Sequence, residues 1–552
     1  MGVSFRGNYG IFMILAAFVV SVLLVNPLGD FPINDDFAYG WTVQNFQDTG
    51  RLVIHDWLSG TVVAQTFLGL LFSLPFGFSF TALRFSTLFM SLVGAVAAYL
   101  ALRELGFGEA KSTVGSLALL FNPLYFNKSF NFSSDIHFMG FMLLSLLFYI
   151  KSVKSGNDLR FMLLGSLFSV FSILTRQNGV LIPVAVVVYL WLNRKRNAFT
   201  FRHFLVVAVV PFAAFMAFEY WFIFIHGPTA SANLMSDYSI SNIIRLVFPY
   251  FPFRLFSMLV YCGLLLLPLT FVSLIGLKGY LRGLRAFDRA LFLVSVMFGL
   301  SGIVFFFFGY GRRLLFYLPN IIHSSGLGSA YLQGVKSPVF PEWLLLAFSL
   351  VSVLSGSVLA LRIKSEMPSK LSLSRLFSGF SLAPENLVYL VGFFQLIFLL
   401  VVMVVFDRYL LPLFFPLFVF LLRRSFSIRA ASVLIIIMAA FSIAGTADMM
   451  SWNRAKNVAI NDFMAQGIPA DRIDGGFEHA AWNFYYYHKE HPEVNVARPY
   501  DPGWLQKEYF PVIDSQYVVS FSPLSNYSSI REYSYFSMLS MRNEKIYALK
   551  RA

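Results

Sequence analysis

Long apolar runs recur along almost the whole chain, and they constrain the fold more strongly than any other feature of the sequence. About 13 of these runs approach the roughly 20 residues that a helix needs to cross a bilayer. They lie at about 11–27, 79–102, 112–128, 135–150, 160–175, 178–192, 203–225, 254–276, 290–308, 342–361, 386–406, 409–422 and 430–447. A further run at 61–75 is short and is broken by Pro75, so it predicts a re-entrant or juxtamembrane helix. The pattern predicts an α-helical polytopic membrane protein.

Basic residues gather in every second loop between these runs. Their positions are Arg103 and Lys111; Lys151, Lys154 and Arg160; Arg194, Lys195, Arg196 and Arg202; Lys278, Arg282, Arg285 and Arg289; Arg362, Lys364, Lys370 and Arg375; and Arg423, Arg424 and Arg429. Because loops rich in lysine and arginine stay on the cytoplasmic side, we expect a multi-pass protein of the cell (inner) membrane. Its N-terminus is then cytoplasmic, and its first loop and C-terminal tail are outside. The net charge of +14 is explained by topology and by membrane lipid headgroups, and we expect no nucleic-acid partner.

The apolar runs stop near residue 447, and the rest of the chain has a different pattern. Residues 453–466 have the pattern of an amphipathic helix, and the segments QYVVSFS and KIYALKR are typical of strands. We therefore predict two domains. A transmembrane domain at 1–447 contains a first outer loop at 28–78, and a small extracytoplasmic α+β domain occupies 448–552.

The first outer loop is acidic, in contrast to the rest of the chain. Residues 31–57 hold several aspartates against a single arginine. Asn34 can cap a helix that has Asp35 and Asp36 in its first turn and Gly50 past its end. The two neighbouring charges are expected to raise the pKa of one carboxylate of the pair, which favours a general base. The alternative is that the pair only complements the helix dipole, an effect worth under about 1 kcal/mol.

Further ionisable side chains are predicted at the same outer face. Asp135 opens a membrane span, and the cationic candidates are Lys128, Arg176, Arg312, Arg313 and Arg408. Ionisable groups near membrane depth are costly and usually mark a working site, and an arginine guanidinium group matches phosphate oxygens. Structural alternatives stay open. Asp135 can cap its helix, Arg176 can snorkel, and Arg408 can pair with Asp407 or with lipid phosphates.

These residue types suit a site that handles a phosphate and a hydroxyl group. Asp35 or Asp135 can take the hydroxyl proton, while the cations balance the phosphate charge. A divalent metal (Mg, Mn or Zn) is another source of positive charge, with Asp36 or Asp135 as its carboxylate ligand. Cys262 is the only cysteine, so a zinc–thiolate site is excluded.

A set of short motifs spread over the chain resembles a known family. The motifs are Asp35-Asp36-Phe37-Ala38-Tyr39, TGRLVIHDW, the apolar run Leu68–Leu74, GFSFTALRFSTLFMSLVGAVAAYLALRELG, Asp135, TRQNG, DRYLLPLF at 407–414 and GGFEHAAW at 475–482. Together they resemble the lipid-dependent glycosyltransferases of the C-type fold, most closely the branch with the protein O-mannosyltransferases and the aminoarabinose transferase of lipid A. The resemblance implies a polyprenyl-phosphate monosaccharide as the sugar donor and Asp35 as the catalytic residue.

The residues and the resemblance together predict an inverting membrane glycosyltransferase. It would move a hexosyl or pentosyl group from the lipid carrier to a hydroxyl group of a lipid, glycan or protein acceptor outside the membrane. Two alternatives stay open. A transporter or flippase of the same carriers would need inverted repeats and ionisable groups near mid-membrane, which the sequence does not show. A glycan polymerase or ligase would use the same outer site with a different donor.

Overall fold

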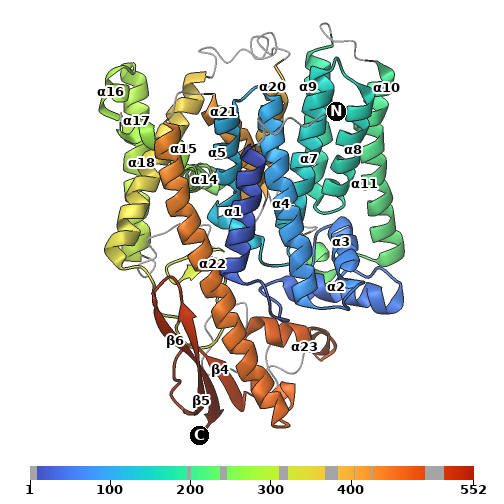
Figure 1. The fold of residues 1–552 in the computed structure, drawn as a ribbon, viewed down its shortest axis with the longest axis vertical. Helices are drawn as coiled ribbons and strands as arrows, with labels where there is room; N and C mark the ends of the chain where they lie inside the picture. The colour runs from blue at the N-terminus through green and yellow to red at the C-terminus, as the bar shows by residue number, and fades with distance from the viewer. Residues whose placement is uncertain are drawn as a thin grey trace.

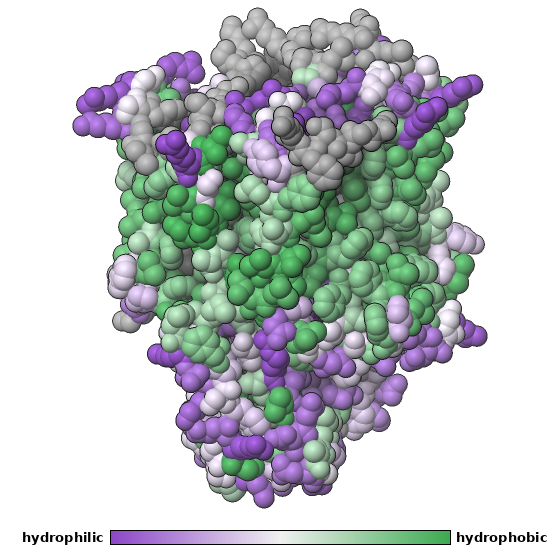
Figure 2. All heavy atoms as spheres, viewed as in Figure 1, coloured by the Kyte–Doolittle hydropathy of each residue, from purple (hydrophilic) through white to green (hydrophobic). Residues whose placement is uncertain are grey.

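The computed structural model describes residues 9–194, 200–235, 245, 247–275, 277–309, 321–366, 383–402, 405–423, 427–491 and 515–552. Most of these residues form a bundle of helices, and a smaller part with a β-sheet lies at one end of it (Figure 1). On the face shown in Figure 2, a belt of apolar side chains crosses the bundle, and polar side chains lie beyond the belt at both ends. This distribution is that of a protein embedded in a bilayer.

Seven helices of the described residues are long and apolar enough to cross a membrane. They are α4 (Phe80–Glu104), α7 (Ser134–Lys154), the continuous helix Phe201–His226 (α10, η3, α11 and η4), Phe248–Leu265 (η5 and α14), most of α17 (Ala286–Gly309), most of α18 (Glu342–Glu366) and α22 (Ile428–Ala465). Shorter apolar helices are α1 (Tyr9–Val25), α3 (Val63–Ser73), α8 (Leu159–Ile173), Gln177–Leu192 (η2 and α9) and α20 (Glu385–Val401). The chain is therefore a multi-pass membrane protein, whereas the count of about 13 crossings stays a prediction.

The structure describes further helices, all of them shorter than 18 residues. They are α2 (Asp36–Thr49), α5 (Glu109–Leu120), α6 (Pro123–Lys128), α12 (Ala230–Met235), α15 (Leu267–Ile275), α16 (Leu277–Arg282), η6 (Asp407–Leu410), α21 (Leu411–Leu422), η7 (Ala470–Arg472) and α23 (Phe477–Glu490). The short α3 agrees with the prediction of a short helix at 61–75.

The apolar run predicted at 112–128 is not one helix. It divides into α5 and α6 because Asn122 and Pro123 lie in its middle. The Asn122 side chain accepts a hydrogen bond from the N–H of Leu124 at 3.1 Å and so caps α6, whose first residue is Pro123. The division places Lys128, the last residue of α6, beside the first outer loop rather than at the end of a full crossing.

No break in the backbone marks the predicted domain boundary near residue 448. The last apolar run and the amphipathic segment 453–466 form one continuous helix of 38 residues, α22. No proline or glycine lies between Ala447 and Ala465, so nothing interrupts the backbone hydrogen bonds there. As a result, α22 extends from the bundle into the smaller part of the molecule (Figure 1).

The smaller part contains a four-stranded sheet in the order β3-β4-β6-β5. β3 (Ile473–Asp474) is parallel to β4 (Tyr517–Ser520), and β6 (Arg542–Arg551) is antiparallel to both β4 and β5 (Tyr527–Ser537). β4 and β6 coincide with the two predicted strand segments, whereas β5 and α23 were not predicted. A separate hairpin of β1 (Ile322–His323) and β2 (Gly326–Leu327) lies between α17 and α18 in the chain.

Candidate functional site

The first outer loop forms the helix that the sequence predicts. α2 ends at Gly50, whose φ of 68° is the left-handed conformation of a helix C-terminus. The residue at the N-cap is Asp35 rather than Asn34, and the Asp35 side chain makes no capping hydrogen bond. The Asp35 carboxylate is therefore held by other groups than the first turn of α2.

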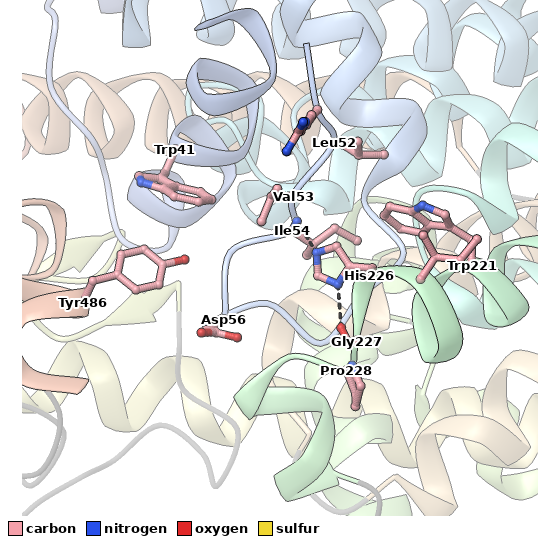
Figure 3. A pocket seen from close by; sticks show the side chains of 12 residues that line it. Trp41, Leu52, Val53, Ile54, Asp56, Trp221, His226, Gly227, Pro228 and Tyr486 are labelled. Carbon is pink, nitrogen blue, oxygen red and sulfur yellow. Dashed lines mark hydrogen bonds between the residues drawn. The ribbon is translucent and has the colours of Figure 1, made fainter. Parts of the chain in front are cut away.

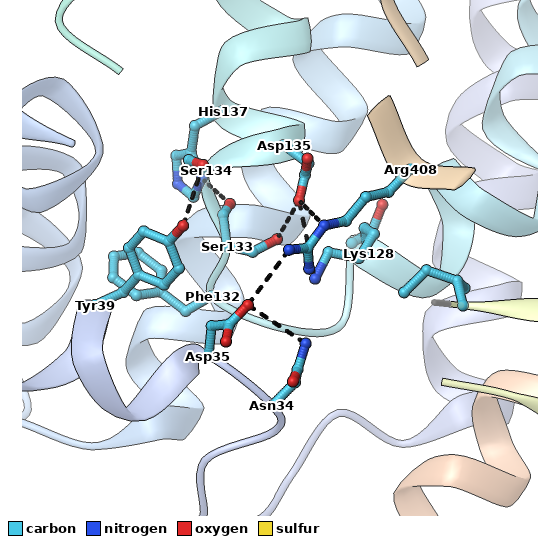
Figure 4. A network of polar contacts seen from close by, with 12 residues as sticks. Asn34, Asp35, Tyr39, Lys128, Phe132, Ser133, Ser134, Asp135, His137 and Arg408 are labelled. Carbon is cyan, nitrogen blue, oxygen red and sulfur yellow. Dashed lines mark hydrogen bonds and ion pairs between the residues drawn. The ribbon is translucent and has the colours of Figure 1, made fainter. Parts of the chain in front are cut away.

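The Asp35 carboxylate contacts side chains from two parts of the chain. Its Oδ1 atom accepts a hydrogen bond from the indole Nε1 of Trp57 at 3.0 Å. Its Oδ2 atom lies 3.4 Å from Nη2 of Arg408 and 3.4 Å from Nδ2 of Asn34 (Figure 4). The Asp35 side chain is 19% exposed, so a substrate hydroxyl group can approach it.

Arg408 joins the two carboxylates that the sequence singles out. While its Nη2 atom contacts Asp35, its Nε atom lies 3.9 Å from Oδ2 of Asp135. Burial by itself would lower the pKa of Arg408, but the charges of Asp135 and Asp35 outweigh burial and raise the pKa well above its usual value. The neighbouring Asp407 carboxylate accepts backbone hydrogen bonds, among them one from the N–H of Ile321 at 2.9 Å.

Asp135 is enclosed by cations and a hydroxyl group. Arg176 forms an ion pair with its Oδ1 atom, and Nζ of Lys128 lies 3.9 Å from its Oδ2 atom. Ser133 donates a hydrogen bond from Oγ to the same Oδ2 atom at 3.2 Å. The Asp135 side chain is only 4% exposed. A carboxylate so enclosed can orient the surrounding cations, but an acceptor hydroxyl group cannot reach it. Asp135 therefore fits an orienting role better than the predicted role of general base.

Arg176 belongs to the TRQNG turn, which packs on the first outer loop. The backbone N–H of Val62 donates to the carbonyl of Thr175 at 3.2 Å, and the Gln177 side chain donates to the carbonyl of Ser59 at 2.8 Å. These bonds fix the turn relative to α3 and direct Arg176 toward Asp135. The pKa of Arg176, which burial would lower, is raised by the nearby Asp135.

Cations outnumber carboxylates in this cluster, in which Asp35, Asp36 and Asp135 lie among Arg84, Lys128, Arg176 and Arg408. Burial raises the pKa of Asp36 to about 7, although Lys128 and Arg84 act in the opposite direction. The sequence predicts a raised pKa for one carboxylate of the pair, and Asp36 has one, but the cause is burial and not the like charge of Asp35. The surplus of positive charge suits an anionic ligand such as a phosphate.

The surroundings of Asp36 do not fit a divalent metal. Within the residues that the structure describes, no group of three or more His, Cys, Asp or Glu side chains is placed to hold one. Asp36 is 2% exposed, and its nearest charged neighbours, Arg84 and Lys128, would repel a dication. The metal role predicted for Asp36 is therefore not carried further.

Two of the predicted donor-binding residues, Arg312 and Arg313, lie outside the described residues. His137, near the start of α7, makes polar contacts inside the bundle. Its Nδ1 atom lies 3.2 Å from the carbonyl oxygen of Ser133, and its Nε2 atom lies 3.4 Å from Oγ of Ser86. Its ring is fully buried, so we assign it to packing.

Arg84 is a central residue of the region that the sequence reasoning missed. Its guanidinium group is fully buried and donates hydrogen bonds to four carbonyl oxygens, those of Pro27, Gly29, Phe31 and Phe130, at 2.6–3.1 Å. It thereby ties the start of the first outer loop to the segment between α6 and α7. The available signal was a lone arginine inside the apolar run 79–102.

A pocket of about 770 Å³ lies near this cluster, between the first outer loop, the end of η4 and α23. Trp41 and Tyr486 lie on one side of it and Trp221 on the other, with Asp56 between them (Figure 3). Asp56 directly precedes Trp57, the residue that donates to Asp35. The pocket is therefore linked to the Asp35 carboxylate through Trp57, which follows Asp56 in the chain and donates a hydrogen bond to Asp35.

Comparisons with known proteins give one family match. The sequence profile of the dolichyl-phosphate-mannose-protein mannosyltransferase family matches residues 60–221, which is less than a third of the chain. This region contains α3, α4, Lys128, Asp135 and Arg176. No curated protein matches the chain.

Several solved structures resemble the fold at low sequence identity. ArnT from Cupriavidus metallidurans, bound to undecaprenyl phosphate, is 15% identical with a TM-score of 0.45, and the likeness covers 98% of this chain and 97% of that one. The Pmt1-Pmt2 protein O-mannosyltransferase complex of S. cerevisiae, bound to the sugar donor, is 15% identical with a TM-score of 0.34. This likeness covers 40% of the present chain and 34% of the matched yeast chain. The oligosaccharyltransferase AglB from Archaeoglobus fulgidus is 14% identical with a TM-score of 0.43, and covers 84% of this chain and 60% of that one.

Because these TM-scores are below 0.5, we draw no functional argument from the solved structures. The family match rests on the sequence itself, and it overlaps motifs that suggested the resemblance. It confirms that the chain resembles the lipid-dependent glycosyltransferases of the C-type fold, in the branch that contains the protein O-mannosyltransferases.

Proposed function

We propose that the chain is an inverting glycosyltransferase that moves a sugar from a polyprenyl-phosphate carrier to an acceptor hydroxyl group on the outer face of the membrane. One observation carries the proposal: a partly exposed carboxylate, Asp35, contacts Arg408 at the edge of a cluster with surplus cations. This contact supports the proposal because a carboxylate that can take a proton lies beside cations that can bind a phosphate. The family match independently supports a membrane glycosyltransferase.

The proposed reaction is a single displacement at the anomeric carbon of the donor sugar. The acceptor oxygen forms a bond to that carbon from the face opposite the phosphate, and its proton passes to Asp35. The bond between the anomeric carbon and the phosphate oxygen breaks, and its electron pair leaves with the polyprenyl phosphate. A phosphate leaves readily as an anion, so this reaction needs no general acid, unlike glycoside hydrolysis.

The cations of the cluster have two roles in this proposal. Arg408 and Arg176 hold the phosphate of the donor and stabilise the charge that develops on it as the bond breaks. Lys128 adds a third positive charge from the buried side of the cluster. Asp135 contacts all three cations, so we assign it the role of orienting them before the donor binds.

The substitution Asp35→Asn tests the proposal. Asparagine has nearly the same shape and retains a carbonyl oxygen for Trp57, but it cannot take a proton. We expect the rate of sugar transfer to fall by about 10²–10⁴-fold, the usual contribution of a general base, while the affinity for the donor changes little. Transfer from labelled polyprenyl-phosphate sugars by the purified protein measures the rate.

The matched control is Asp48→Asn, which removes an exposed carboxylate from the same helix, α2. We expect this control to keep the wild-type rate. An Asp35→Asn protein that transfers sugar as fast as the control would contradict the role of Asp35 as the base. Wild-type protein that transfers no sugar from any polyprenyl-phosphate donor would contradict the proposed function as a whole.

A further inference from the structure

A buried ion pair connects two helices of the smaller part of the molecule. Nζ of Lys456, on α22, lies 3.0 Å from Oε2 of Glu478, in the first turn of α23. The side chains are 2% and 1% exposed. Charges so deeply buried are costly unless each is paired and hydrogen-bonded, so both oxygens of Glu478 need partners.

The second partner of Glu478 belongs to the first outer loop. Its Oε1 atom accepts a hydrogen bond from the backbone N–H of Asn34 at 3.0 Å. Asn34 has a φ of 55°, an uncommon conformation for a residue other than glycine. The Asn34 side chain in turn lies 3.4 Å from Oδ2 of Asp35 (Figure 4). Glu478 therefore holds the peptide unit between Ile33 and Asn34, one residue before Asp35.

The local sequence before Glu478 fixes its direction. Gly476 has a φ of 84°, and a Cβ atom there would lie 2.5 Å from the carbonyl oxygen of Tyr331, so no larger residue fits without a shift. The Asp474 side chain accepts the N–H of Gly476 at 3.1 Å. The ring of Phe477 packs edge-on against Phe37 of α2, with ring centres 5.7 Å apart. The start of α23 is thus fitted to the first outer loop.

We propose that Glu478, supported by Lys456, is a positioning residue that sets the orientation of the Asp35 carboxylate. Glu478 does not touch the reacting atoms. It holds the Asn34 peptide in its left-handed conformation, and this conformation directs the Asp35 side chain toward Arg408. The inference rests on the proposed function, and it gives the smaller part of the molecule an indirect role in catalysis, through the position of Asp35.

Two double variants isolate the hydrogen bond to Asn34. In Lys456→Gln/Glu478→Gln, both charges are removed, but an amide oxygen at position 478 can still accept the Asn34 N–H. In Lys456→Met/Glu478→Met, side chains of similar length also remove both charges and leave that N–H without an acceptor. Because apolar pairs often replace buried ion pairs without loss of stability, both proteins are expected to fold.

We expect the glutamine pair to keep kcat within about threefold of the wild type. The methionine pair should lower kcat by about 10- to 100-fold, with the KM for the donor unchanged within about twofold, since small misplacements of a catalytic group have effects of this size. A merely structural role would instead lower kcat equally in both variants, or in neither. Either of these results would overturn the inference.

Two further measurements separate positioning from loss of stability. Asp462→Asn removes the carboxylate that Arg531 and Tyr533 contact on the exposed side of α22, so it perturbs the same part without touching the first outer loop. It should keep the wild-type kcat even if it lowers Tm. If the methionine pair does not fold, Asn34→Gly and Asn34→Ala give a second test, because both remove the side-chain contact with Asp35 but only glycine adopts the positive φ without strain. Asn34→Gly should keep kcat near the wild type and Asn34→Ala should lower it, and an equal kcat in the two variants would overturn the inference.

Hydrogen exchange of the peptide that covers residues 30–37 gives a readout that does not depend on activity. In the methionine pair this peptide should exchange faster than in the glutamine pair. If the wild type transferred no sugar but the difference in exchange remained, the proposed function would fail while the link between Glu478 and the loop would stand. Equal exchange in both pairs would refute the link itself.

Discussion

Replacing Asp36 by asparagine is expected to stabilise the protein above pH 7. Asp36 is 2% exposed, its Oδ2 atom lies 3.4 Å from the backbone nitrogen of Ile33, and hydrogen bonds from the backbone N–H groups of Phe132 and Ile33 offset only part of the cost of burying its charge. Burial raises its pKa from 3.8 to about 7. The folded state therefore favours the protonated, neutral form of this carboxyl group.

The expected magnitude follows from the two pKa values. Between pH 3.8 and about 7, the folded state binds more protons at Asp36 than the unfolded state, so the free energy of unfolding falls as the pH rises through this range. Each unit of difference corresponds to about 1.4 kcal/mol. The full cost of the ionised Asp36 is therefore about 4 kcal/mol above pH 8, and about 3 kcal/mol of it accumulates between pH 5 and pH 8.

Asparagine has the shape of the protonated group and does not titrate, so Asp36→Asn removes this cost. Tm measured in detergent from pH 5 to pH 8.5 should fall for the wild type and stay more nearly constant for the variant, with the largest difference at high pH. Asp48→Asn, on the exposed side of α2, should follow the wild type. A variant less stable than the wild type at pH 8.5 would refute the reasoning, because it would mean that Asp36 is ionised and held by Arg84 and Lys128.

Two further predictions concern donor binding and topology. Arg176→Lys and Arg408→Lys should each weaken binding of a polyprenyl-phosphate ligand by about tenfold, because lysine keeps the charge but loses the planar guanidinium fork; unchanged affinity in both variants would mean that the phosphate binds elsewhere. In a Cys262→Ser background, new cysteines at Ser59 and Ser525 should react with an impermeant thiol reagent from the outer side, because the alternation of basic loops places both outside. Labelling of either position only from the cytoplasmic side would contradict the orientation.

Two kinds of sequence feature predict parts of the site: residues that mark the end of a helix, and the alternation of basic loops that assigns each loop to one side of the membrane. The end of α2 before Gly50 follows from the preference for glycine after a helix, whereas its N-cap is Asp35 and not the predicted Asn34. The alternation of basic loops assigns Lys128, Asp135 and the TRQNG turn to one face, and the structure brings them within ion-pair distance of one another. At Gly50, a single glycine marks the end of a helix, and the structure ends α2 directly before it, as predicted.

The contacts that depend on distant pairing could not be predicted. Asn34 and Glu478 are 444 positions apart, and neither residue has a pattern that marks a partner. The two glycines before Glu478 suggest a turn, so the helix that follows them was missed. Burial of Asp36 is likewise a property of the packed loop, since the same Asp-Asp pair on an exposed helix would keep both carboxylates in water.

The continuity of α22 explains how the smaller part of the molecule can support the first outer loop. If the last membrane helix ended near residue 448, a loop would separate the membrane bundle from Lys456 and Glu478, and the bundle would not fix their position. Instead, Lys456 lies on the same uninterrupted helix as the apolar residues of the last crossing, so its position is set by the bundle. The ion pair with Lys456 fixes the side chain of Glu478, and Glu478 in turn fixes the backbone of the loop at Asn34. The orientation of Asp35 thus depends on a helix that begins on the opposite side of the bundle.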